Sequence, residues 1–173
     1  MTLLVVPPAR WCHSGRMSSP NVTTVDAGPQ QVSRRVVVPA KAAVLFGLLA
    51  DPRRHSELDG SGTVHDIVAG PARLGLGDTF SVRMTWNRIP YRITSTVTAF
   101  EENALLEWQH PLKHRWRWEL LETGPGQTQV TETWDYRGHN VRFFELTKYP
   151  QINGKGIGRT LEQLRARFAA TAG

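Results

Sequence analysis

The chain has 173 residues, of which 40% are hydrophobic and 21% charged, and its formal net charge is +6. This length fits one domain with a substantial core, and the composition is that of an ordinary globular protein. No apolar run approaches the roughly 20 residues needed to cross a bilayer, so we expect a cytoplasmic protein without a membrane span. The lone cysteine, Cys12, excludes an internal disulfide and a cysteine-based zinc site.

Residues 1–30 differ in composition from the rest of the chain. They contain Pro7-Pro8 and Gly28-Pro29 and show no sustained hydrophobic periodicity. Segments of this kind bury too little apolar surface to offset the entropy lost on ordering. We therefore expect a disordered tail over residues 1–30 and one folded domain over residues 31–173. Met17 lies inside the tail, so we keep the hypothesis that part of it precedes the native start, which mass spectrometry of the native protein would test.

The folded part is predicted to open with a strand and two short helices. Residues 31–38 read as a strand, and residues 41–50 as a helix. Asp51 is placed to cap a second short helix that has Pro52 at its first position, where a missing amide proton costs nothing. A turn then leads to a second strand over residues 63–69.

Five stretches between residues 79 and 136 alternate apolar and polar side chains. Period-two alternation predicts strands with one buried and one solvated face. The gaps between them are short, so we expect antiparallel hairpins. With residues 63–69 they form a six-stranded meander, and residues 31–38 add a seventh strand at its edge. The apolar face carries Met84, Trp86, Tyr91, Trp108, His110, His114, Trp116, Trp118, Glu132, Trp134 and Tyr136.

The C-terminal part is predicted to be a loop followed by a long helix. Residues 137–153 read as a loop with a brief helical turn. Gly154, Gly156 and Gly158 are interpreted as a flexible hinge. From about residue 155 to 170 one helical face recurs, formed by Ile157, Leu161, Leu164 and Phe168. This helix is the one element large enough to cover the apolar face of the sheet, and a curved sheet would leave a pocket beneath it.

This order of elements, together with the segment DPRRHSELDGSGTV at residues 51–64, resembles the START-like (SRPBCC) superfamily, which includes the birch-pollen allergens and the polyketide cyclase/dehydrase-like proteins. The resemblance covers about residues 31–170. It implies the α+β helix-grip fold: a curved seven-stranded antiparallel sheet wrapped around a long C-terminal helix, with two short helices after the first strand. It also implies a hydrophobic cavity for lipids, polyketides or sterols. Only some members are enzymes, mainly aromatase/cyclases, and the superfamily has no universal catalytic motif.

The aromatic and apolar side chains of the inner face are the candidate ligand-binding residues. Tryptophan and tyrosine give wide flat walls, each with one polar group that can orient a ligand. An alternative is that the same rings meet the helix and fill the core, and both readings stay open. The candidates are Met84, Trp86, Tyr91, Trp108, Trp116, Trp118, Trp134 and Tyr136.

His110, His114 and Glu132 are the candidate catalytic residues. They point to the apolar face, where an unpaired polar group costs about 1–3 kcal/mol. They could supply the general acid or base of an aldol or dehydration step. Alternatively, the histidines lie at the solvent-exposed end of a hairpin and Glu132 pairs with an arginine. Their spacing is not diagnostic of a metal site, so we expect no metal and no cofactor.

The remaining polar motifs have structural or surface interpretations. His55, Ser56, Asp59 and Ser61 belong to the turn segment of the resemblance, and the sequence does not support a catalytic triad there. Lys113, Arg115 and Arg117 alternate away from the tryptophans, which argues against a nucleic-acid platform.

Three hypotheses follow: a module that binds a hydrophobic small molecule, a polyketide cyclase or dehydratase that uses the same cavity, and a regulator that acts through its basic surface. Whether the protein is an enzyme is left open, and the sequence does not predict the oligomeric state or the ligand.

Overall fold

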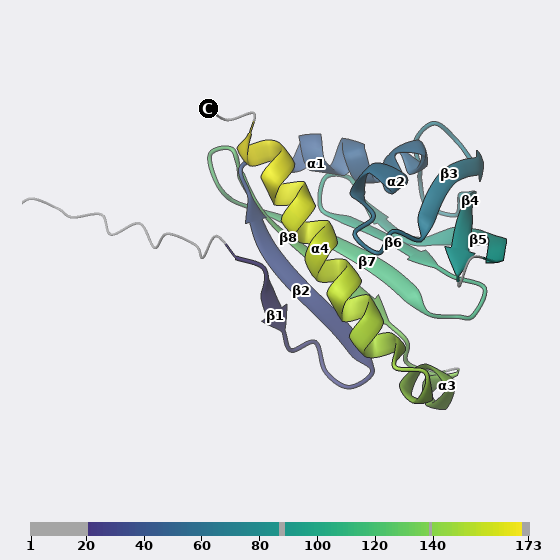
Figure 1. Ribbon diagram of the computed structural model, residues 1–173. Coiled ribbons are helices and arrows are strands. Elements are labelled where there is room, and N and C mark those ends of the chain that lie inside the picture. Colours follow the sequence, from purple (N-terminus) through teal and green to yellow (C-terminus); the bar gives the residue numbers. More distant parts are fainter. Residues whose placement is uncertain (1–20, 87–88, 139, 171–173) are drawn as a thin grey trace, which may run out of the picture.

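The computed structural model describes residues 21–86, 89–138 and 140–170, and in them the chain is an α+β fold (Figure 1). An open antiparallel sheet of eight strands carries a long C-terminal helix on one face. The strands are β1 (Thr23–Val25), β2 (Gln31–Val38), β3 (Val64–Ala69), β4 (Thr79–Trp86), β5 (Ile89–Glu101), β6 (Leu105–Gln109), β7 (Arg115–Gly124) and β8 (Gln127–Asp135). The helices are α1 (Ala42–Leu49), the 3₁₀ helix η1 (Pro52–Arg54), α2 (His55–Leu58), α3 (Val141–Leu146) and α4 (Tyr149–Ala169).

The strand order in the sheet is β1-β2-β8-β7-β6-β5-β4-β3. Strands β3 to β8 form the predicted six-stranded meander, and β2 closes it by pairing with β8. The sheet has one strand more than expected, because residues 23–25 pair antiparallel with β2. Residues 23–30 therefore form part of a β-hairpin, although the sequence placed them in a disordered tail. Residues 1–20 of the expected tail lie outside the described residues.

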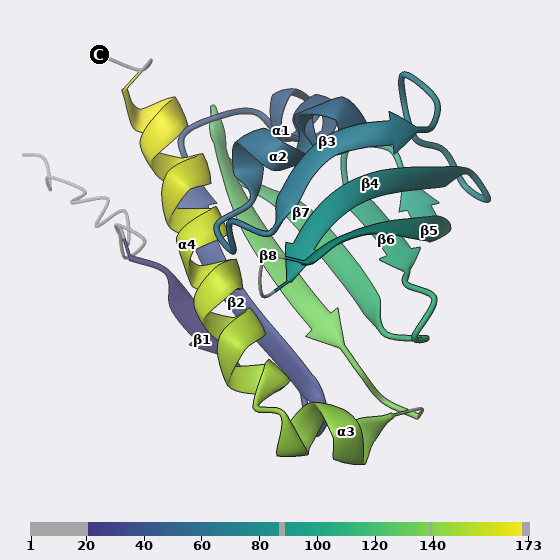
Figure 2. The same cartoon turned by 45° about the vertical axis from the view of Figure 1, so that its right-hand side comes forward.

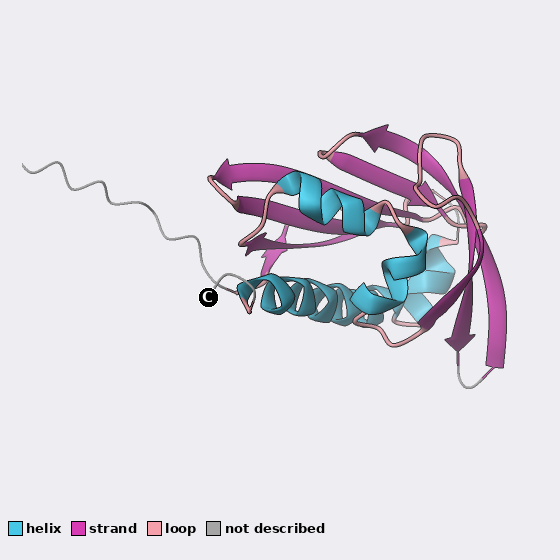
Figure 3. Cartoon of the chain, turned by 90° about the horizontal axis from the view of Figure 1, so that it is seen from above, coloured by secondary structure: helices cyan, strands magenta, loops and turns pink. Residues whose placement is uncertain are grey.

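The sheet is strongly curved, and α1, α2 and α4 all lie on its inner side (Figures 2 and 3). Helix α4 runs along β2 and reaches β8, whereas α1 packs on β7. The core between these layers is apolar. It includes Val36, Val38, Leu45, Phe46, Leu106, Val130, Ile157, Leu161 and Leu164, all at most 2% exposed.

Helix α4 is longer than the sequence predicted, because the glycines expected to form a hinge lie inside it. It begins at Tyr149 and ends at Ala169. A Cβ on Gly154 would lie 3.2 Å from Val32 Cγ1, and a Cβ on Gly156 would lie 3.4 Å from Ser61 Cβ. These glycines therefore let the helix approach β2 and the turn before β3 closely, and this tertiary packing outweighs their low helix propensity.

The segment that carries the family resemblance has a structural role, as predicted. Asp51 caps η1 by accepting a hydrogen bond from the Arg53 amide at 3.1 Å. The Asp59 carboxylate accepts hydrogen bonds from the amides of Thr63 and Val64, both at 2.8 Å. Gly60 donates its amide to Thr160 Oγ1 of α4 at 2.9 Å, which ties the turn to the long helix.

Candidate functional site

The strand register arranges the inner-facing side chains in two rows across the sheet. Side chains at paired positions of antiparallel strands point to the same side. The first row consists of Leu106, Trp118, Glu132 and Arg34, and the second of Trp108, Trp116, Trp134 and Val32. Both rows end on β2 beside Gly154 of α4, so they face the space between the sheet and the helix.

The predicted ligand-binding side chains are distributed along this inner face. Trp118, Trp134 and Tyr136 are buried, whereas Met84, Trp108 and Trp116 are partly buried beside the core. Tyr91, near the start of β5, is 38% exposed. Trp86 ends β4, and its side chain lies outside the described part of the structure. Whether these side chains touch a ligand stays a prediction.

One end of the inner face is filled by aromatic rings that pack on one another. The rings of Trp134 and Tyr136 are stacked with their centroids 4.5 Å apart. Phe144 of α3 meets Trp134 edge to face at 5.2 Å and His114 at 5.4 Å. At this end the rings fill the core, which agrees with the alternative that these side chains pack inside the protein. Phe144 was not among the predicted site residues, because it lies in a segment predicted to be mostly loop.

The two histidines of the β6–β7 hairpin lie together inside the protein. The rings of His110 and His114 are stacked with their centroids 4.3 Å apart, and His114 is 8% exposed. The alternative that placed them at a solvated hairpin end is therefore wrong for His114. Burial lowers the pKa of His110 to about 4 and that of His114 to about 3. Both imidazoles are neutral at pH 7.

Glu132 is buried in the middle of β8 without a counterion. It is 5% exposed, and among the described residues it has neither an ion pair nor a hydrogen bond. The expected pairing with an arginine is therefore wrong, although Arg34 lies directly opposite in the register. Burial, and secondarily the charge of Asp59, raises the pKa of Glu132 well above its usual range. This favours the neutral acid.

His55, at the start of α2, is a further polar side chain that packs against the inner face of the sheet. His55 stacks on Trp108 at 5.2 Å and meets Phe80 edge to face at 5.4 Å. Its Nε2 lies 2.8 Å from the Leu49 carbonyl oxygen, and burial lowers its pKa. From the sequence, His55 was predicted only to be part of a turn segment.

Polar atoms without partners are concentrated on the inner face. In the described residues, five buried side-chain atoms have no hydrogen-bond partner: His110 Nδ1, His114 Nδ1, Trp118 Nε1, Glu132 Oε2 and Trp134 Nε1. All five belong to β6, β7, β8 or the hairpin between β6 and β7. Buried polar groups in proteins are nearly always paired, so these five atoms require partners other than the protein's own side chains, such as water or a ligand.

The opposite, outer face of the sheet is different in character. A hollow of about 490 Å³ lies there beneath the β1–β2 hairpin, lined in part by Ser33, Arg35 and Thr133. The predicted basic row is neutralised in part: Arg117 contacts Glu107 and Glu119 at 3.3 Å, and Arg115 lies 3.9 Å from Glu107. The argument against a nucleic-acid platform stays a prediction.

No metal centre or membrane-spanning helix is present in the part of the chain that the structure describes. No three His, Cys, Asp or Glu side chains there are close enough together to hold a metal ion. None of the described helices is both long and apolar enough to cross a bilayer.

The fold places this chain in the START-like helix-grip class. The chain belongs to the family of polyketide cyclase / dehydrase and lipid transport proteins, whose sequence model matches residues 29–169. It is 51% identical to the uncharacterized protein Rv0088 of Mycobacterium tuberculosis over 153 residues, which is 86% of this chain and 68% of that protein.

Solved structures confirm the fold. A START superfamily protein from Mycobacterium smegmatis is similar with a TM-score of 0.62 and 14% identity, over 82% of this chain and 98% of its own. A Polyketide_cyc-like protein from Corynebacterium glutamicum is similar with a TM-score of 0.60 and 18% identity, over 83% of this chain and 93% of its own. At these identities the likeness concerns the fold alone.

Proposed function

We propose that this protein binds a hydrophobic small molecule, such as a lipid or a polyketide, between the inner face of the sheet and α4. The observation that carries the proposal is the set of five buried, unpartnered polar atoms, which lie among aromatic walls on that face alone. Burial of apolar ligand surface would provide the binding free energy, at about 25 cal/mol per Å² before the costs of ordering. The polar atoms would orient the ligand.

The polar atoms restrict what the ligand carries. The indole nitrogens of Trp118 and Trp134 only donate hydrogen bonds, and a neutral Glu132 can donate as well. A ligand that satisfies them must present acceptors along its body, such as carbonyl, ester or ether oxygens. A plain hydrocarbon would leave these donors unpaired, at a cost of about 1–3 kcal/mol for each.

A second candidate function is a cyclase or dehydratase that uses the same space. The specific observation in its favour is the stacked pair of neutral histidines with free Nδ1 atoms. A neutral imidazole can accept a proton from a carbon next to a carbonyl, and the neutral Glu132 could return one. Loss of turnover in His110→Ala or Glu132→Gln with unchanged ligand affinity would favour this candidate over simple binding.

The third hypothesis, a regulator that acts through its basic surface, gains less support from the structure. Two of the three basic residues in the predicted row have acidic neighbours on the same face. Binding through such a surface should weaken steeply as salt rises.

The proposal is tested with the methyl ester of cis-parinaric acid, an uncharged polyene probe. Tryptophan emission overlaps the absorption of this probe, so binding beside Trp108, Trp116 and Trp118 should give saturable energy transfer. Trp116→Phe should reduce the transfer. Leu121→Ala is the matched control, because Leu121 is 60% exposed on β7 and alternates to the outer face. Transfer that never saturates would contradict binding within the fold.

A further inference from the structure

We propose that Arg34 binds the anionic head of the ligand, so that the site prefers carboxylic acids over their uncharged esters. The inference rests on the proposed function and narrows it. It starts from the placement of Arg34, which alternates with Val32 and Val36 on the inner face of β2. At the inner-facing positions of β2 and β4 to β8 whose side chains the structure describes, Arg34 is the one lysine or arginine.

The guanidinium of Arg34 forms one hydrogen bond with the described residues of the protein. Its Nη1 donates to the Ser33 carbonyl oxygen at 2.9 Å, and no carboxylate among the described residues lies within ion-pair distance of it. A guanidinium carries five N–H donors, so most of them are left for another partner. A partly buried cation without a counterion is costly, and an anion in that position would remove the cost.

The residue opposite Arg34 does not supply the missing charge. Glu132 is its register partner on β8, yet the two side chains form no ion pair. Burial favours the neutral form of Glu132, which leaves the positive charge of Arg34 uncompensated on this face. A carboxylate head fits the planar, forked donors of arginine better than any uncharged polar group does.

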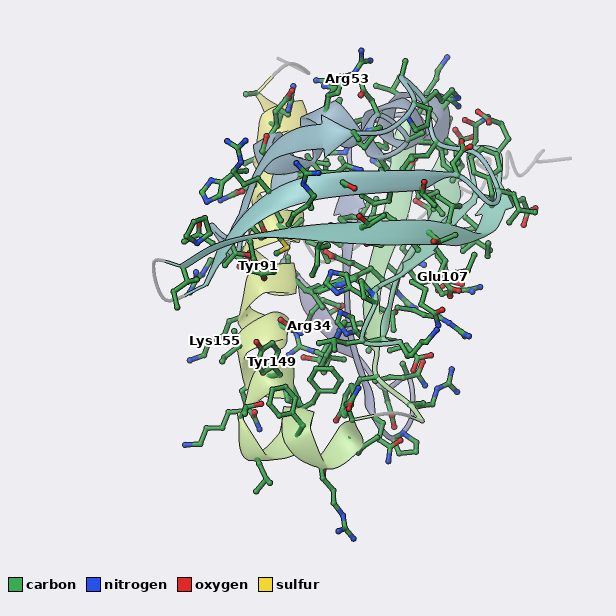
Figure 4. The ribbon with its side chains drawn as sticks, turned by 90° about the vertical axis from the view of Figure 1, so that its right-hand side faces the viewer. Arg34, Arg53, Tyr91, Glu107, Tyr149 and Lys155 are labelled. Carbon is green, nitrogen blue, oxygen red and sulfur yellow. The ribbon has the colours of Figure 1, made fainter. Side chains whose placement is uncertain are left out.

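Arg34 lies where helix α4 passes close to β2. A Cβ on Gly154 would lie 3.2 Å from Arg34 Nη2, so the backbone of α4 approaches the guanidinium closely. In the view of Figure 4, Arg34 is seen between Tyr91 of β5 and Tyr149 at the start of α4. With its acidic head here, a ligand would extend its apolar body along the rows toward Trp118 and Trp108.

The test compares cis-parinaric acid with its methyl ester at pH 8, where the acid is ionised. Energy transfer from tryptophan gives the Kd of each probe for the full chain. We expect the acid to bind about 10-fold more tightly, as a charge-assisted pair allows. Arg34→Met should abolish this preference by weakening the acid while leaving the ester unchanged. Arg35→Met is the matched control, because Arg35 is the next residue of the same strand and faces the outer hollow.

The outcomes separate this inference from the proposed function. Equal affinities of acid and ester in the unmodified protein would overturn the inference, and so would a preference that survives in Arg34→Met. The first comparison needs no variant and is independent of how Arg34→Met folds. If neither probe binds saturably, the proposed function itself fails and the inference fails with it. Arg34→Lys should keep part of the preference, because it keeps the charge but loses the forked geometry.

Discussion

Glu132 shows how burial turns one side chain into a pH-dependent element. Its pKa is raised in the folded protein, so between its ordinary value of 4.5 and its folded value the folded chain holds a proton that the unfolded chain has lost. The free energy of unfolding therefore falls as pH rises through this window, by about 1.4 kcal/mol per pH unit. Burial therefore favours the neutral acid over the carboxylate inside the sheet.

Replacing Glu132 with glutamine should remove this dependence. Glu132→Gln keeps the shape but cannot ionise, so its stability relative to the unmodified protein should increase from pH 5 to pH 8. Urea unfolding at several pH values measures the difference. Glu162→Gln, at an exposed position of α4, serves as the control and should show no such trend. A constant difference across this pH range would mean that Glu132 ionises in place.

His114 should have the opposite effect on stability. Burial lowers the pKa of His114 to about 3 in the folded protein. As the pH falls below 6.5, the unfolded chain therefore binds a proton at His114 that the folded chain does not bind. The free energy of unfolding therefore falls by about 2 kcal/mol between pH 7 and pH 5. His114→Phe, which keeps an aromatic ring beside Trp134 and Phe144, should lose less stability over this interval.

Thermal or urea unfolding at pH 7 and pH 5 checks the His114 prediction. The control is His65→Gln, because His65 is exposed on β3, where its Nε2 lies 2.8 Å from Thr85 Oγ1. Equal acid sensitivity of His114→Phe and the unmodified protein would show that His114 protonates in the folded state.

At the scale of elements, the packing of α4 depends on glycines that have different roles. A Cβ on Gly60 would lie 2.3 Å from the Thr160 amide nitrogen, a distance that no repacking of a side chain can relieve. Around Gly158 nothing lies within 4 Å of such a Cβ. The turn before β3 and the helix therefore touch at Gly60, whereas Gly158 is a solvent-side glycine within the helix.

These roles predict opposite effects on stability. Gly60→Ala should lower the free energy of unfolding by about 2–4 kcal/mol, because the turn and α4 must separate. Gly158→Ala should raise it by up to about 1 kcal/mol through helix propensity. Chemical denaturation of the two variants tests both. A neutral effect of Gly60→Ala would mean that the contact between the turn and α4 is looser than the structure shows.

The sequence predicts elements well where one physical signal dominates. Strands β4 to β8 follow from period-two alternation, and the cap at Asp51 follows from its place before Pro52. Strand β1 was missed, because three residues carry no periodicity and depend on pairing with β2. The first turns of α4, residues 149–154, were missed because Pro150 and Gly154 have low helix propensity, and packing against β2 explains the helix there.

For the candidate site, alternation gives the face of a residue but not its partner. It placed His110, His114 and Glu132 inside, and the structure confirms that placement. Glu132 and Arg34 are paired in the register but form no ion pair, and residue spacing in the sequence does not predict the side-chain conformations that decide this. Arg34 was not predicted as a site residue, because residues 31–38 were interpreted only as an edge strand.

At the scale of the whole molecule, the curved sheet and α4 enclose a face that combines apolar walls, unpartnered donors and one unpaired cation. The outer face carries ion pairs and a separate hollow. This asymmetry between the two faces is the basis for proposing that the ligand binds at the inner face.

The most direct test is native mass spectrometry of the freshly purified full chain, followed by organic extraction and identification of any adduct. We predict a co-purified lipid-like or polyketide-like acid bound to the protein, or uptake of such an acid when it is added. A clean unliganded mass that stays clean after incubation with fatty acids, sterols and aromatic polyketides would contradict the account. The unpartnered inner-face atoms would then be satisfied by water within a closed core.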